Sequence, residues 1–273
     1  MATIELDHRR INYQDHGTGL PVLFGHSYLW GAEMWRPQVD ALAEQYRCIV
    51  PELWGHGGSD SPGGGDVYHL NHLTEDFVGF VNALGLDRFA IVGLSIGGMW
   101  GFRLALNLPD RIVGLVLAGT DLGSESKETR QRFLQMIEAV AAAGCVDLAM
   151  IQTLMPFFFS DMTLRKQPPF LDQFRSVLSE IPGEKLPGIL ALGRGIFQRD
   201  CVLDRMAEIN CPACIVVGEQ DRSRPLFEAE RMAEGISRAQ LHVLKGAGHI
   251  CNLESSNRFT FILRSFLTGL GEA

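Results

Sequence analysis

One serine in the sequence stands between closely spaced glycines, in the segment Gly93-Leu94-Ser95-Ile96-Gly97. Glycines two positions before and after a serine permit a sharp strand-to-helix turn, because the backbone there comes too close to its neighbours for larger side chains. Such a turn would hold the Ser95 hydroxyl above a sheet at a helix N-terminus, where the helix dipole favours developing negative charge. The spacing predicts Ser95 as a nucleophile; the alternative is a glycine-rich turn with an incidental serine.

A serine hydroxyl is a weak nucleophile and needs a base that takes its proton. His249 ends the segment Lys245-Gly246-Ala247-Gly248-His249, which directly follows a short apolar run. The two glycines would let this loop carry an imidazole toward the serine. We therefore predict His249 as the general base.

Three carboxylates could orient this histidine. Asp221 follows the apolar run that ends at Gly218 and is our first candidate, with Glu219 in the same loop and Asp121 further upstream as alternatives. The acid would accept a hydrogen bond from the imidazole and hold the tautomer that can receive the serine proton. The resulting chain order of serine, aspartate and histidine is that of neither common class of serine protease.

An acyl-transfer site also needs two fixed donors for the developing oxyanion. We predict the backbone N–H groups of Ile96, which follows the nucleophile, and of Tyr28, in the loop Gly25-His26-Ser27-Tyr28. We expect His26 to hold this loop by hydrogen bonds to the backbone rather than to act in the chemistry. Candidates for the wall of a substrate pocket are His26, Ser27, Trp30, Trp54 and Phe158, although aromatic residues are more often packed in a core.

Short apolar runs bounded by glycine and proline would position these residues. Runs of this kind are typical of strands buried on both faces of a parallel sheet. They lie at residues 21–25, 47–51, 89–93, 112–118, 213–218 and 241–244. Helical spacing of apolar residues between the runs predicts right-handed crossovers and an α/β class, doubly wound and mostly parallel sheet. Residues 3–6 and 10–14 are expected to form an antiparallel edge hairpin.

The alternation of strands and helices stops between residues 123 and 199. This stretch predicts helices at 128–143, 146–154, 170–180 and 186–196, with breakers at Pro156, Pro168-Pro169 and Pro182-Gly183. We therefore expect a core formed by residues 1–122 and 200–273, and a helical cap formed by residues 123–199. Such a cap would cover the carboxyl ends of the strands, where ligands of open α/β sheets bind.

The bulk composition limits the classes of partner. The chain has 273 residues, 46% of them hydrophobic and 21% charged, which is typical of a globular protein and too apolar for a disordered one. Its formal net charge of −8 argues against nucleic acid or an anionic membrane as partner. Neither a leader pattern nor an apolar window of roughly 18 residues is present, so we expect a cytoplasmic location. A homodimer is compatible with the sequence, which does not specify the oligomeric state.

Six cysteines occur, and without a leader we expect reduced thiols. The pair Cys211-Pro-Ala-Cys214 has a spacing known from metal and redox sites, but no second pair at zinc spacing accompanies it. It leads directly into an apolar run, so small buried residues are the favoured interpretation. We therefore do not expect metal or redox chemistry at this pair.

With these motifs in hand, the chain resembles the α/β-hydrolase superfamily over nearly its whole length. Four blocks carry the resemblance in order: Phe24-Gly25-His26-Ser27, Gly55-His56-Gly57-Gly58-Ser59, Gly93 to Gly98, and Gly246-Ala247-Gly248-His249. The segments His26-Ser27 with Met34-Trp35, and Ser95-Ile96-Gly97-Gly98-Met99, are similar to the 3-oxoadipate enol-lactonases and related small-ester carboxylesterases. The resemblance implies an eight-stranded core, a helical cap, and no metal or organic cofactor.

Three positions depart from the pattern of this family. Many relatives have glycine in place of Ser27, and aspartate and arginine in place of Glu52 and Trp54. These changes touch the loops over the site and leave the substrate open. Serine at position 95 argues against haloalkane dehalogenase and epoxide hydrolase chemistry, which uses an aspartate there in this fold.

The sequence thus predicts a serine hydrolase that cleaves a small carboxylic ester or lactone through an acyl-enzyme. Two other reactions on the same fold are alternatives: hydrolysis of a carbon–carbon bond in a vinylogous diketone, and cofactor-free dioxygenation with the histidine as base. A ligand receptor built on the fold is the alternative that is not an enzyme.

Overall fold

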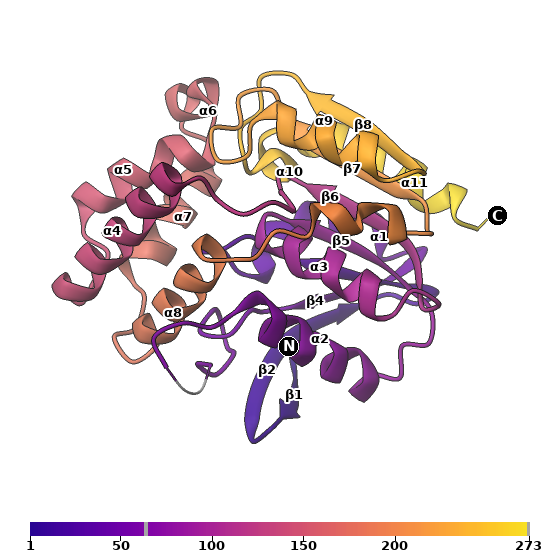
Figure 1. Ribbon diagram of the computed structural model, residues 1–273, viewed down its shortest axis with the longest axis horizontal. Coiled ribbons are helices and arrows are strands. Elements are labelled where there is room, and N and C mark those ends of the chain that lie inside the picture. Colours follow the sequence, from indigo (N-terminus) through magenta and orange to yellow (C-terminus); the bar gives the residue numbers. More distant parts are fainter. Residues whose placement is uncertain (63–64, 272–273) are drawn as a thin grey trace.

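The apolar runs form the strands of one eight-stranded sheet in a computed structural model that describes residues 1–62 and 65–271 (Figure 1). The strand order is β1-β2-β4-β3-β5-β6-β7-β8. Strand β2 pairs antiparallel with β1 and β4, and the other neighbouring pairs are parallel. The strands are Ala2–Leu6 (β1), Arg9–His16 (β2), Leu20–Gly25 (β3), Tyr46–Pro51 (β4), Phe89–Leu94 (β5), Ile112–Ala118 (β6), Ala213–Gly218 (β7) and Ala239–Leu244 (β8). The predicted mostly parallel sheet and its antiparallel edge hairpin are confirmed.

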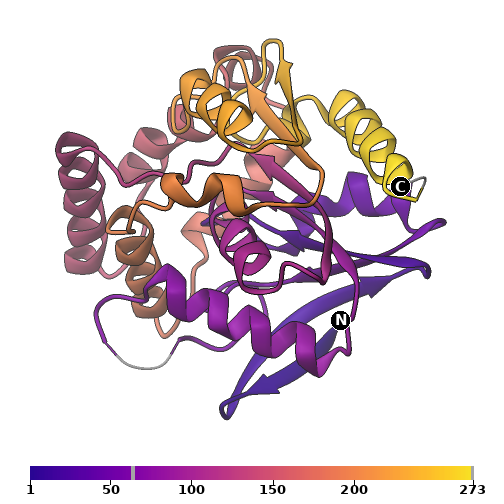
Figure 2. The same cartoon turned by 45° about the vertical axis from the view of Figure 1, so that its right-hand side comes forward.

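Helices cover both faces of this sheet, because successive residues of each buried strand point to opposite faces. In β3, Val22 packs in one hydrophobic cluster with α1 and α11, while Leu23 packs in another with α2, α3 and α9. Figure 2 shows α2 and α3 lying side by side on one face of the sheet. These helices are Arg36–Leu42 (α1), Leu70–Ala83 (α2), Ile96–Asn107 (α3), Leu226–Gly235 (α9) and Ser256–Gly269 (α11).

Five further helices lie between β6 and β7 in the chain, and we call them the cap. They gather beside one end of the sheet, on the left in Figure 1. They are Lys127–Ala143 (α4), Leu148–Phe158 (α5), Asp161–Lys166 (α6), Pro169–Ser179 (α7) and Leu186–Phe197 (α8). All of them fall within the predicted cap range of 123–199. Trp30, in the loop after β3, stacks on Phe174 of α7 with ring centroids 4.9 Å apart, so core and cap share buried aromatic contacts.

The prediction that Pro156 breaks a helix is wrong, because α5 continues through Pro156 to Phe158. A proline removes only its own backbone donor, which would have bonded the carbonyl of Gln152. Gln152 is exposed to solvent, and the apolar side of α5 stays packed against its neighbours.

Within the described residues, four short helices were not predicted: α6, the 3-10 helices Ala32–Trp35 (η1) and Leu203–Glu208 (η2), and the α-helix Cys251–Glu254 (α10). All four are too short for apolar periodicity to reveal them.

Candidate active site

Ser95 stands alone between β5 and α3 in a left-handed backbone conformation, with φ +59° and ψ −119°. This region is costly for residues other than glycine and is held only where the surroundings enforce it. A side-chain carbon added at Gly93 would lie 2.2 Å from the carbonyl oxygen of Gly97, and one added at Gly97 would lie 2.1 Å from that of Gly25. Both glycines of the motif are therefore required by close backbone packing around the turn.

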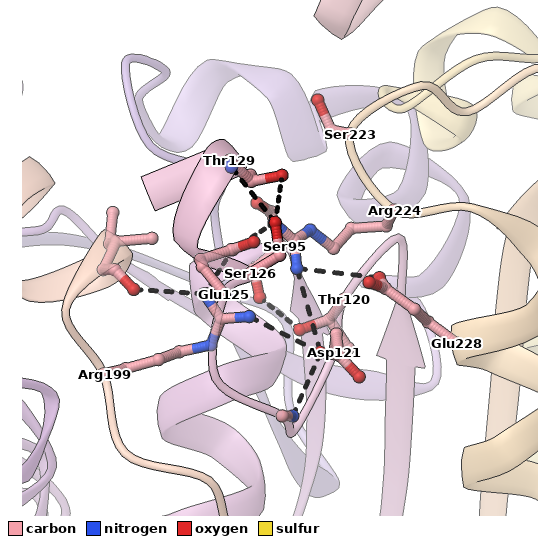
Figure 3. Close-up of polar contacts among 12 residues, drawn as sticks. Ser95, Thr120, Asp121, Glu125, Ser126, Thr129, Arg199, Ser223, Arg224 and Glu228 are labelled. Carbon is pink, nitrogen blue, oxygen red and sulfur yellow. Dashed lines mark hydrogen bonds and ion pairs between the residues drawn. The ribbon is translucent and has the colours of Figure 1, made fainter. Parts of the chain in front are cut away.

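Hydrogen bonds fix the backbone of this turn to the neighbouring strand. The Ser95 N–H donates to the Ala118 carbonyl at 2.9 Å. The Thr120 hydroxyl donates to the Ser95 carbonyl at 2.7 Å (Figure 3). The end of β6 thus holds the serine in place.

His249 and Asp221 form a buried pair. The imidazole Nδ1 lies 2.9 Å from Asp221 Oδ2, and the two side chains are 4% and 0% exposed. The other carboxylate oxygen accepts hydrogen bonds from the backbone N–H groups of Ser223 (2.9 Å) and Arg224 (2.8 Å). An ionised carboxylate can only accept, so the Nδ1 contact corresponds to the tautomer of His249 with its proton on Nδ1. Within the described residues Nε2 has no hydrogen-bond partner.

Neither alternative acid forms a hydrogen bond with His249 within the described residues. Glu219 accepts a hydrogen bond from the Gly246 N–H at 2.9 Å and is exposed. Asp121 forms an ion pair with Arg231 at 2.7 Å. Of the three carboxylates, the geometry brings only Asp221 to the imidazole.

Ser95 and His249 line the same cavity, although they lie far apart in the sequence. No hydrogen bond joins the Ser95 hydroxyl to the imidazole among the side chains that the structure describes. Contacts of this kind are often long in ligand-free sites and shorten when substrate binds.

Two neutral histidines hold the loop after β3. His26 accepts a hydrogen bond at Nε2 from the Leu53 N–H (2.9 Å), so its Nδ1 donates to the Ser27 carbonyl (2.8 Å). Burial lowers the pKa of His26 to about 4. His56 accepts at Nε2 from the Leu29 N–H (3.2 Å), and burial, followed by the nearby His26, lowers its pKa to about 3. His26 thus connects two loops through hydrogen bonds to their backbones, in agreement with the role expected from the sequence.

This bracing shapes the site where an oxyanion would bind. Leu29, whose N–H meets His56, has a left-handed φ of +65°. Within the described residues, neither the Tyr28 N–H nor the Ile96 N–H has a hydrogen-bond acceptor, and Tyr28 and Ser95, which directly precedes Ile96, both line the cavity. The Tyr28 hydroxyl donates to the Ile189 carbonyl of α8 at 2.9 Å, so it connects the loop after β3 to the cap.

The cavity lies between core and cap and encloses about 880 Å³, including the part open to solvent. Of the five pocket residues predicted from the sequence, Ser27 and Phe158 line it, and the Phe158 ring centroid lies 5.8 Å from that of His249. His26, Trp30 and Trp54 are not among the described residues of its wall, so the structure corrects these three predictions. The Trp30 ring stacks on Phe174 of the cap, and the Trp54 indole donates to Asp76 of α2 at 2.7 Å.

Most of the cavity wall comes from cap residues that the sequence analysis did not single out. Helix α4 contributes Phe133, Met136, Ile137 and Val140, which recur at helical spacing on one side of the helix. That apolar stripe is the signal by which they could have been found. Helices α5 and α8 supply further apolar side chains.

A buried ionic cluster lies beside the acid loop and was also missed (Figure 3). Arg199 Nη1 lies 2.6 Å from Glu125 Oε1, and Arg224 Nη2 donates to the same oxygen. Although burial raises the pKa of Glu125, Arg224 and Arg199 hold it below its ordinary value. Glu228 stands on the other side of Arg224, where burial raises its pKa to about 7. The cluster connects both chain crossings into the cap with the loop that carries Asp221.

No group of three His, Cys, Asp or Glu side chains within residues 1–62 and 65–271 could hold a metal ion. Cys211 and Cys214 are free thiols, and burial raises their pKa values to about 11 and about 12. None of the helices in the described part of the chain combines the length and apolar composition that a membrane span requires.

Comparison with known proteins identifies the family. The chain matches the model of the alpha/beta hydrolase fold over residues 21–256, and it belongs to that family. Within the family it is similar to 3-oxoadipate enol-lactonase 1 of Acinetobacter baylyi, with 26% identity over 91% of this chain and 89% of the relative. The predicted resemblance to the enol-lactonase group is thus confirmed.

Two further relatives of this chain have names that indicate different hydrolytic reactions. 2-Hydroxymuconate semialdehyde hydrolase of Pseudomonas sp. is 27% identical over 94% of this chain and 90% of the relative. A thermophilic esterase from Thermogutta terrifontis superimposes with a TM-score of 0.88 at 30% identity, over 98% of this chain and 97% of the esterase. These relatives are named as hydrolases, which supports hydrolase activity for this chain.

Proposed function

We propose that this protein is a serine hydrolase that cleaves a small carboxylic ester or lactone through an acyl-enzyme. The observation that carries the proposal is the buried Asp221–His249 hydrogen bond at the cavity that Ser95 also lines. The similarity to an enol-lactonase and an esterase supports the choice of an acyl–oxygen bond.

Each residue has one task in this mechanism. Ser95 Oγ attacks the substrate carbonyl while His249 Nε2 takes its proton, and Asp221 keeps Nδ1 protonated and stabilises the imidazolium. The N–H groups of Tyr28 and Ile96 bind the oxyanion of the tetrahedral intermediate. The imidazolium then gives the proton to the departing alkoxide oxygen. A water molecule, deprotonated by His249, attacks the acyl-enzyme and releases the acid with Ser95 restored.

A fluorophosphonate probe tests the nucleophile directly. The folded protein should be labelled at Ser95, and both the denatured protein and Ser95→Ala should remain unlabelled. The variant should also lose on the order of a millionfold in kcat on a 4-nitrophenyl ester, the size seen when a triad member is removed. Ser237→Ala, which changes an exposed serine away from the cavity, is the matched control. A folded protein that takes no label would overturn the proposal.

A second candidate is hydrolysis of a carbon–carbon bond, which the similarity to 2-hydroxymuconate semialdehyde hydrolase favours. The same residues would serve, with a carbanion in place of the alkoxide as leaving group. Product analysis on a vinylogous diketone beside 4-nitrophenyl esters separates the two reactions. Faster turnover of the diketone would favour the second candidate.

A further inference from the structure

The inside of the cavity is almost free of groups that could bind charge. Its wall carries six residues with polar side chains: Ser27, Tyr28, Ser95, Ser223, Arg224 and His249. Three of their hydroxyls are already occupied: Tyr28 donates to the Ile189 carbonyl (2.9 Å), Ser223 to the Phe157 carbonyl (2.7 Å) and Ser27 to the Tyr28 carbonyl (3.4 Å). Ser95 and His249 are assigned to the chemistry. The remaining wall, most of it from α4, α5 and α8, is apolar.

Arg224 is the cation in this wall, and its charge is already compensated. Its side chain is 6% exposed. Nη2 donates to Glu125, while Nη1 lies 3.6 Å from Glu228 Oε2 and 3.9 Å from Asp121 Oδ2. Nη1 has no hydrogen-bond acceptor among the described residues, but an incoming carboxylate would meet two carboxylates beside it. Arg224 therefore offers little net attraction to an anion.

A carboxylate taken from water into an apolar cavity without a partner loses its hydration and gains nothing in return. An apolar chain in the same place gains from burial at about 25 cal/mol per Å². Three methionines at positions 99, 136 and 150 line the cavity, and their flexible side chains adapt to chains of different shape.

We propose that the substrate is an uncharged ester or lactone with a flexible apolar chain, and that the cavity rejects the same chain when its far end carries a carboxylate. The chain would extend from Ser95 between α4, α5 and α8. This inference rests on the proposed hydrolase function for its reaction, but it concerns the charge of the ligand and is tested separately.

Kinetics with three 4-nitrophenyl esters test the inference. They are 4-nitrophenyl octanoate, the mono-4-nitrophenyl ester of octanedioic acid, and the same mono-4-nitrophenyl ester with its free carboxyl group converted to a methyl ester. The methyl ester restores neutrality at nearly constant length. We expect kcat/KM for the acid to be about 100-fold lower than for both neutral esters, since an unpaired buried carboxylate costs several kcal/mol. A carboxylate-bearing ester that reacts as fast as the neutral ones would overturn the inference and would indicate that Arg224 binds anions.

A binding experiment separates this inference from the proposed reaction. Ser95→Ala, which binds without turnover, is titrated by calorimetry with octanamide and with the monoamide of octanedioic acid. We expect the neutral amide to bind about 100-fold more tightly, for the same reason as in the kinetics. Equal affinities would overturn the inference even if the esters are hydrolysed. If no ester is hydrolysed but the neutral amide binds more tightly, the proposed reaction fails and the charge selection stands.

A cation placed in the wall should reverse the preference. Met136 of α4 is half-buried and lines the cavity, so Met136→Lys would supply a partner for the distal carboxylate. We expect the ratio of acid to neutral ester in kcat/KM to rise at least about tenfold, the effect of one partly buried ion pair. Met136→Gln, of similar length and without charge, should leave the ratio as in the natural chain. Equal ratios in the two variants would contradict the inference.

Discussion

Three histidines, His26, His56 and His249, are buried, and the partners of each ring distinguish their tasks. His26 and His56 each use both ring nitrogens on backbone groups, so neither has a nitrogen left for substrate. His249 uses only Nδ1, on Asp221. At the residue scale, an Nε2 without a hydrogen-bond partner among the described residues is what distinguishes His249 as our proposed base.

Asp221→Asn tests the orientation of this base. The amide oxygen would stay on the N–H groups of Ser223 and Arg224, so the amide NH2 would face Nδ1 and donate to it. The histidine is then stabilised in the wrong tautomer, and kcat should fall by about 10⁴. Steady-state hydrolysis of a 4-nitrophenyl ester measures the loss. Glu219→Gln, in the same loop, is the matched control and should change kcat less than about tenfold, as expected for an exposed carboxylate. A larger effect at Glu219 or Asp121 than at Asp221 would assign the acid elsewhere.

The neutral brace histidines should make the fold sensitive to acid. The pKa of His56 is about 3 in the folded protein, against 6.5 for the unfolded chain, so the unfolded chain binds a proton that the folded chain does not. The free energy of unfolding therefore falls as the pH drops below about 6.5. By pH 5 this histidine alone should account for about 2 kcal/mol of the fall.

Urea unfolding at several pH values measures this contribution. Between neutral pH and pH 5, the free energy of unfolding of His56→Gln should fall by about 2 kcal/mol less than that of the natural chain. His16→Gln, an exposed histidine, is the control and should keep the full dependence. The same acid sensitivity in both variants would show that His56 titrates normally in the folded protein.

At the scale of elements, the cap is fastened to the core by charge as well as by packing. Glu125 lies where the chain enters the cap, Arg199 lies where it leaves, and Arg224 follows the acid loop. The backbone N–H of Arg224 also donates to Asp221. A displacement of the chain where it enters or leaves the cap would therefore shift the carboxylate that contacts His249.

Glu125→Gln should destabilise the protein strongly. It leaves Arg199 and Arg224 buried side by side without the carboxylate between them, and breaking a buried pair from one side costs about 3–5 kcal/mol. Urea unfolding followed by circular dichroism measures the change. Glu138→Gln, which removes an exposed partner of Arg194, should cost less than about 1 kcal/mol. Similar losses in both variants would show that the buried cluster adds no stability.

The hydroxyl of Tyr28 provides a second connection between elements, from the loop after β3 to α8. Tyr28→Phe removes this hydrogen bond but keeps the backbone N–H that we assign to the oxyanion. We expect kcat/KM to fall less than about tenfold, because losing an oxyanion donor typically costs a hundredfold or more. A loss of that larger size would mean that the hydroxyl itself acts on the substrate.

The elements differ in how well the sequence predicts them. Strands such as β5 and β7 could be predicted because they are buried on both faces and read as continuous apolar runs. The elbow at Ser95 could be predicted because its glycines have a steric cause. The cap's cavity wall and the Arg224 cluster could not, since both depend on which helix faces meet in space. Trp54 illustrates the limit, because its type suits a pocket while its partner, Asp76, comes from helix α2.

At the scale of the whole molecule, core and cap share one hydrophobic cluster. It includes Val22 and Phe24 of the sheet together with Ile137, Phe158 and Phe174 of the cap. A continuous buried cluster couples its parts, so the two should unfold together.

Two reporters can test this cooperativity in one urea titration. The four tryptophans are buried and lie in the core, and Cys145, exposed between α4 and α5, can carry a fluorophore in a Cys201→Ser background. The two midpoints should coincide, as in a two-state transition. A cap signal that changes at lower urea than tryptophan emission would show that the cap opens independently.

The shared ion pair of Glu125 and Arg199 means that both ends of the insert meet at one point of the scaffold. A segment whose ends already lie together can be exchanged as a cassette without stretching the chain that remains. Spliced between positions 125 and 199, the cap of a relative would bring a new pocket wall to an unaltered Asp221–His249 pair. Substrate range and reaction chemistry could therefore evolve, or be engineered, as separable parts of this chain.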